Sequence, residues 1–131
     1  MGSYGEKIEK LGSSHRRHLR KILNVGWPNN ISNKELYKRT KVTALSCRIK
    51  SARWNMIGNV LRQGENKPAY LAFYFAINEA KNYPACKGRP PINLLDQTIR
   101  DLLEKGIIIN SSEDIREIRE KAKNKDEWER M

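Results

Sequence analysis

Apolar residues recur at spacings of three and four along much of this chain, which is the spacing of amphipathic helices. In the first segment, one side of a helix would carry Ile8, Leu11, His15, Leu19 and Ile22. A helix of this kind buries its apolar side against a neighbour and leaves its charged side in water. The pattern predicts a mostly α protein, a small helical bundle of five or six helices.

The stretch from residue 31 to residue 63 resembles a helix-turn-helix. Ser32 followed by Glu35 is the capping-box pattern of a helix start, and Ile31 is placed as its hydrophobic staple. We expect a short helix, a turn over residues 40–43, and a long helix over residues 44–63. This helix-turn-helix-like N-terminal half is a layout that offers a helix to a groove, although helical hairpins also occur in bundles that bind nothing.

The second half is less regular. Residues 70–75 are apolar on all sides and predict either a buried strand or a buried helical turn, a short irregular or strand-like stretch that periodicity does not resolve. Gly106 is a natural end for a helix that begins near Leu95. Ser111 or Ser112 is expected to cap the last helix. The residues of that last segment expected to pack are Ile115, Ile118, Ala122 and Trp128.

The net positive charge lies entirely in the first half. Residues 1–62 contain 14 Lys and Arg against 3 acids, whereas residues 63–131 contain 12 against 12. We therefore expect a basic helical subdomain over residues 1–63 and a charge-neutral helical subdomain over residues 64–131, packed together or separate. A charge excess confined to one segment creates a directional field and predicts a polyanionic partner, RNA or DNA.

Twelve basic residues are candidates for contacts with phosphate. Four of them follow one another on the polar side of the first helix, which we expect to be exposed. The main set is Arg16, Arg17, Arg20, Lys21, Lys38, Arg39, Lys41, Arg48, Lys50 and Arg62, and a second, smaller contact is Lys87 and Arg89.

Three aromatic residues are candidates for stacking on bases, namely Trp27, Tyr37 and Trp54. Burial in the core is the favoured interpretation for all three. Arg53 has two alternatives of nearly equal weight, a contact with nucleic acid or a salt bridge to an acid such as Glu35.

Other kinds of function lack a sequence pattern. No apolar run is long enough to span a bilayer, so we expect no membrane contact. Cys47 and Cys86 are far apart, which indicates a reducing intracellular compartment, nucleus and cytoplasm. His15 and His18 lack the paired short cysteine spacing of a structural zinc site. With no nucleophile elbow and no glycine-rich phosphate loop, we expect no metal, cofactor, small-molecule substrate or catalysis by this chain alone.

Five stretches, taken in order, resemble one family. Together they are similar to the C-terminal region of non-LTR (LINE-type) retrotransposon polyproteins, downstream of the reverse transcriptase thumb. The similarity covers the chain from about residue 7 to its end. The stretches are 15–23, 31–37, Arg53-Trp54 to Gly58-Asn59-Val60-Leu61-Arg62, Gly88-Arg89-Pro90-Pro91, and Asp126-Glu127-Trp128-Glu129-Arg130.

The resemblance implies a partner of a polymerase rather than a polymerase, since the chain has no Tyr-x-Asp-Asp motif. Such a segment is expected to help the reverse transcriptase core of the same polyprotein to grip template RNA or target DNA during target-primed reverse transcription. Two departures are Asn59, where the family usually has His, and Leu94 or Leu95 in place of a Trp. The alternative is a helical protein-interaction module whose basic face docks an acidic protein surface, such as the polymerase core.

Overall fold

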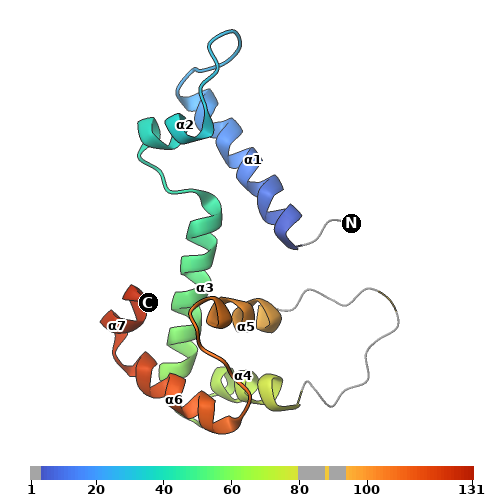
Figure 1. Ribbon diagram of the computed structural model, residues 1–131, viewed down its shortest axis with the longest axis vertical. Coiled ribbons are helices and arrows are strands. Elements are labelled where there is room, and N and C mark those ends of the chain that lie inside the picture. Colours follow the sequence, from blue (N-terminus) through green and yellow to red (C-terminus); the bar gives the residue numbers. More distant parts are fainter. Residues whose placement is uncertain (1–3, 80–87, 89–93) are drawn as a thin grey trace. The chain divides into compact units, whose positions relative to one another are not determined.

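The computed structural model describes residues 4–79, 88 and 94–131, and these residues form seven helices and no strand (Figure 1). The protein is therefore mostly α, a small helical bundle as expected. The helices are α1 (Tyr4–Ile22), α2 (Asn33–Thr40), α3 (Leu45–Arg62), α4 (Pro68–Glu79), α5 (Leu94–Glu104), α6 (Ser112–Lys123) and α7 (Lys125–Arg130).

The chain forms two compact units, Met1–Ser51 and Ala52–Met131. The boundary lies inside α3, whereas the charge pattern placed it at residues 63 and 64. The first unit contains 12 Lys and Arg against 3 acids, so most of the net charge belongs to it. No helix among the described residues is both long and apolar enough to cross a membrane.

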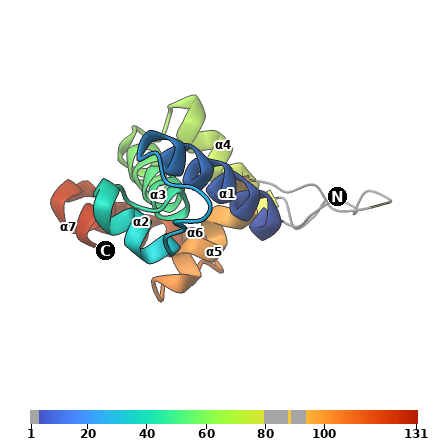
Figure 2. The same ribbon diagram turned by 90° about the horizontal axis from the view of Figure 1, so that it is seen from above.

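In the first unit, α2 packs against α1, and the two lie side by side in both views (Figure 1 and Figure 2). Among the described residues of this unit, the buried hydrophobic ones are Leu19 of α1 and Leu36 of α2. Helix α1 ends at Ile22, and Asn24 just beyond it is left-handed with a φ of 52°. Val25 N donates to Arg20 O at 2.9 Å. Asn tolerates this conformation better than most residues, so it terminates the helix without glycine.

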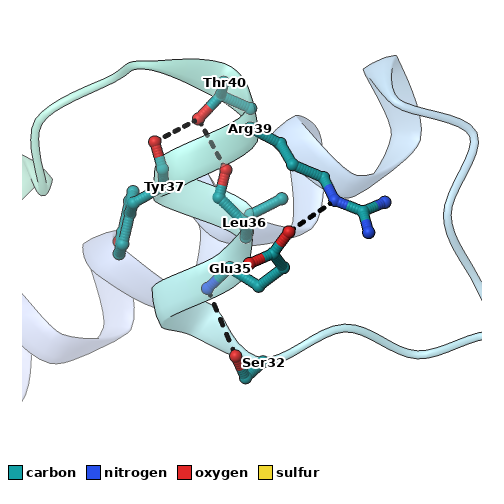
Figure 3. Close-up of polar contacts among 6 residues, drawn as sticks. All are labelled: Ser32, Glu35, Leu36, Tyr37, Arg39 and Thr40. Carbon is teal, nitrogen blue, oxygen red and sulfur yellow. Dashed lines mark hydrogen bonds and ion pairs between the residues drawn. The ribbon is translucent and has the colours of Figure 1, made fainter.

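Helix α2 has the start that its sequence predicts. Ser32 is the N-cap, and its hydroxyl accepts a hydrogen bond from Glu35 N at 3.2 Å (Figure 3). The Glu35 carboxylate does not complete a capping box but pairs with Arg39 Nε at 2.9 Å, one turn further on. The helix ends at Thr40 and is capped by Lys41, which is left-handed with a φ of 54°. The expected turn and the expected bounds of α3 are correct to within about one residue.

The strand-like stretch near residues 70–75 is not a strand. These residues belong to α4, which begins at Pro68. Proline suits the first position of a helix because its fixed φ is helical and its missing N–H would have no partner there. Leu71 N then donates to Lys67 O at 3.0 Å, which continues the turn. The seven helices exceed the expected five or six because α4 is helical and the last segment divides at Asn124, which caps α7.

The core of the second unit contains two stacked tryptophans. Trp54 of α3 and Trp128 of α7 are buried with ring centroids 4.3 Å apart and planes 5° from parallel. Each indole N–H donates to the backbone carbonyl of the other residue, at 2.7 and 3.0 Å. Both buried indole N–H groups therefore have a hydrogen-bond acceptor, as a tryptophan in a protein core usually does. The four residues expected to pack from the last segment are all buried here.

Two further contacts fix α3 within the second unit. Arg53 forms a bidentate ion pair with Asp101 of α5, at 2.8 and 3.0 Å, and both side chains are largely buried. The sequence allowed two roles for Arg53, a contact with nucleic acid or a salt bridge to an acid such as Glu35. In the structure Arg53 forms a salt bridge, and its partner is Asp101. Arg62 donates to Ala122 O at 3.0 Å and to Asn59 Oδ1 at 2.6 Å.

Candidate nucleic-acid interface

Helix α1 turns a slightly different side to α2 than its apolar spacing predicts. Leu19 is buried, but Leu11 and Ile22, on the same expected stripe, are 52% and 78% exposed. The buried side is displaced toward Gly12 and Arg16. This rotation divides the four basic residues of α1 into two pairs with different surroundings.

Arg16 and Arg20 are half-buried and not on a freely exposed face, so the expectation of exposure is wrong for both. The guanidinium of Arg16 donates to Glu9 Oε1 at 2.7 Å and to Ser13 Oγ at 3.1 Å. Hydrogen bonds to the Glu9 carboxylate and to the side chain of Tyr37 raise the pKa of Arg16 above its ordinary value. Arg16 therefore links α1 to α2 and stays charged.

Arg20 holds the loop between α1 and α2. Its guanidinium donates to Asn33 Oδ1 at 2.7 Å and to Ile31 O at 3.3 Å, at the end of the loop. Its backbone carbonyl accepts from Val25 N at the start of the loop. Both arms of the loop are thus attached to one residue of α1.

Arg17 and Lys21 differ from Arg16 and Arg20 in burial, since both are exposed. They lie four residues apart and therefore on one face of α1, one turn from each other. Arginine and lysine in this position present their donors to solvent, where a phosphate can approach them.

The four basic residues meet around a hollow of about 490 Å³ in the first unit, which we call the basic hollow. Its wall also includes polar side chains from α1, the loop and α2, namely Ser13, Asn30 and Asn33. None of the described residues that line it carries a carboxylate. The amides were missed by sequence reasoning, because nothing in the local pattern indicates that the loop folds back onto α1.

A second hollow, of about 660 Å³, adjoins the first along the loop. The two hollows share Val25, Gly26 and Asn30, and the second is lined in addition by Trp27 and Arg39. Trp27 is 88% exposed, so the favoured expectation that it is buried is wrong. Its neighbours Gly26, Pro28 and Asn29 break regular structure and keep it on an exposed loop.

The other aromatic candidates are placed differently. Trp54 is buried in the core of the second unit, as favoured, and Tyr37 is half-buried beside Arg16. Neither presents an open ring face comparable to that of Trp27.

The remaining basic candidates do not line the basic hollow. Lys38, Lys41, Arg48 and Lys50 are exposed residues of the first unit, and Arg39 is paired with Glu35. Arg62, a candidate for phosphate contact, is half-buried in the second unit, and its guanidinium donates to the backbone of α6. Lys87 and Arg89 lie outside the described residues.

The described part of the chain contains no cluster of three His, Cys, Asp or Glu side chains that could hold a metal ion. Cys47 is a free, exposed thiol, and Cys86 lies outside the described residues. His18 Nδ1 bonds to Ser14 O at 2.7 Å within its own helix.

A scan against protein-family models, a search of curated proteins and a search of solved structures each found no match to this chain. What the interface can do chemically follows from its own side chains: converging donors, a positive field and one exposed ring are suited to an anionic polymer that carries bases.

Proposed function

We propose that this chain is a nucleic-acid-binding accessory domain and that the basic hollow contacts the phosphate backbone. The observation that carries the proposal is the lining of this hollow by four cationic side chains without a carboxylate. The surrounding unit has four times as many basic as acidic residues, so its field attracts a polyanion from a distance.

The resemblance to the C-terminal region of non-LTR retrotransposon polyproteins adds a biological context to this proposal. In that context the domain lies beside the reverse transcriptase core of the same polyprotein and binds template RNA or target DNA during target-primed reverse transcription. Support comes from residues of separate motifs that contact one another: Trp54 stacks on Trp128, and Gly58 lies against the same indole. These two motifs would then serve to build the second unit, whereas the stretches 15–23 and 31–37 belong to the first unit, which we propose to bind.

The basic hollow supplies the test of phosphate binding. Arg17 and Lys21 are replaced together by Gln, because both are exposed and the described contacts that join α1 to α2 and to the loop are made by Arg16 and Arg20 instead. Replacing Arg16 or Arg20 as well would confuse binding with folding, since these two hold α1 to α2 and to the loop. The matched control replaces Arg116 and Lys121, two exposed basic residues of α6, and removes the same charge from the second unit.

Binding of labelled RNA is measured by fluorescence anisotropy at several salt concentrations. Each phosphate contact adds about 0.7 to the slope of log K against log salt for a single strand, so R17Q/K21Q should reduce that slope by about 1.4. The control should leave the slope nearly unchanged. Absence of binding by the unaltered protein at low salt would refute the proposal and favour docking of the basic face on an acidic protein.

A further inference from the structure

Trp27 is the most exposed large hydrophobic residue in the described part of the chain. Single apolar residues are common on protein surfaces and need no function by themselves. Trp27 differs through its position, since it lines a hollow that shares Val25, Gly26 and Asn30 with the basic hollow. An indole next to converging phosphate donors combines the two elements by which proteins hold unpaired nucleotides.

The loop that carries Trp27 is held at both ends. Arg20 accepts from Val25 N before the indole and donates to Ile31 O and Asn33 Oδ1 after it. A further turn closes through Asn30 N, which donates to Pro28 O at 3.1 Å. These bonds attach the base of the loop to the helix that carries Arg17 and Lys21, so the ring and the cations belong to one surface.

We infer that the first unit recognises single-stranded nucleic acid, with Trp27 stacked on an unpaired base while Arg17 and Lys21 hold the adjoining phosphates. This inference rests on the proposed function and specifies its ligand. Bases within a duplex are covered by their neighbours, so a ring on a surface loop stacks only on a base that is unpaired or at an end. The chemistry recognised is a base beside its phosphodiester, which RNA and DNA single strands share.

The first experiment compares three labelled probes of one sequence, about 12 nucleotides long, a length within the usual site sizes. The probes are single-stranded RNA, single-stranded DNA and the DNA duplex. Stacking on one aromatic side chain contributes enough that Trp27→Ala should weaken single-strand binding between about fivefold and about 150-fold. Duplex binding should change by less than about twofold, and Trp27→Tyr should retain most of the single-strand affinity, because it keeps a ring.

A matched control tests whether any exposed aromatic residue would have the same effect. Phe75 of α4 is half exposed on the second unit, and Phe75→Ala should leave single-strand binding unchanged. The ratio of RNA to DNA binding identifies the source of the strand, and binding of either strand that depends on Trp27 agrees with the inference.

The second experiment uses the protein's own fluorescence. The chain has three tryptophans, of which Trp54 and Trp128 are buried and stacked, so acrylamide quenches mainly Trp27. Saturation with single-stranded RNA should protect the indole and lower the quenching constant. The W27F variant keeps only the buried pair, and its weak quenching should not respond to RNA.

The outcomes separate the two proposals. Suppose that the unaltered protein binds and that R17Q/K21Q weakens binding. If W27A then has no effect on affinity, or weakens the binding of single strand and duplex equally, the inference is overturned and the proposed function stands. Unchanged quenching of the unaltered protein at saturation also overturns it. If no probe binds at low salt, the proposed function itself fails.

Discussion

At the scale of single residues, Gly58 and Trp128 approach each other closely in the second unit. A Cβ at position 58 would lie 2.6 Å from Trp128 Cδ1, well inside contact distance. The indole cannot retreat without giving up its stacking on Trp54 and its hydrogen bond to Trp54 O. Glycine at this helical position therefore makes room for the tryptophan pair rather than bending the backbone.

Gly58→Ala should destabilise the protein by about 1–3 kcal/mol, because overpacking costs more than the helix propensity that alanine gains. Urea unfolding followed by near-ultraviolet circular dichroism measures both stability and the packing of the pair. Gly12→Ala is the matched control in α1, where the nearest atom belongs to the flexible end of Arg16 and the change should be neutral or mildly stabilising. A Gly58→Ala variant as stable as the parent would contradict the packing described.

At the scale of elements, the start of α6 depends on one carboxylate. Asp114 accepts from Asn110 N and Ser111 N, both at 2.8 Å, and its own N–H donates to Ser111 Oγ at 3.4 Å. These backbone hydrogen bonds lower the pKa of Asp114 from its ordinary value of 3.8. The lowered pKa means that the folded protein favours the charged carboxylate.

Asp114→Asn should therefore reduce stability near neutral pH. A carboxylate with a lowered folded pKa stabilises fully above its unfolded pKa, 3.8 for Asp114, and this contribution is lost as pH falls through the folded value. The stability gap between parent and variant should close on acidification, as followed by urea midpoints between about pH 7 and about pH 2. Glu113→Gln removes a charge from the same turn, and an equal pH dependence in that variant would argue against the capping box.

Local signals in the sequence located most of the elements. Ser32, the turn after Thr40, the end at Gly106 and the cap at Ser111 depend on residues within one turn of each other, so the sequence is sufficient to find them. The helical conformation of residues 70–75 was not resolved by their periodicity, because an all-round apolar run suits either a helix or a strand. Their length and the proline at position 68 were the available signals.

At the scale of the whole molecule, the sequence indicated how charge is distributed along the chain. It did not indicate which basic side chains form contacts within the fold and which remain exposed. Arg53 finds its partner Asp101 at a distance of 48 residues, and no local rule selects that acid over Glu35. Arg20 was expected to bind phosphate, yet its bonds hold a loop that only the fold brings to it. The exposure of Trp27 likewise depends on the path of that loop, so the candidate site was predictable in its charge and not in its shape.

The two units also differ in how much apolar surface they bury. Of the thirteen buried hydrophobic residues in the described part of the chain, Leu19 and Leu36 belong to the first unit and the rest to the second. Because apolar burial is the main source of stability, the first unit should open locally at a lower free energy than the second. If the first unit binds nucleic acid as proposed, its stability gains the most from the ligand.

Hydrogen exchange measured on peptides along the chain tests this difference. Amides of α1 and α2 should exchange earlier than those of α6 and of α3 beyond residue 52. Single-stranded RNA at about 100 times its Kd should protect the first unit by up to about 2.7 kcal/mol, since it binds only the folded form. The second unit, already stabilised by its core, should change little. Equal protection of both units without RNA would contradict the difference in burial, and new protection confined to α6 and α7 would place the binding surface on the other unit.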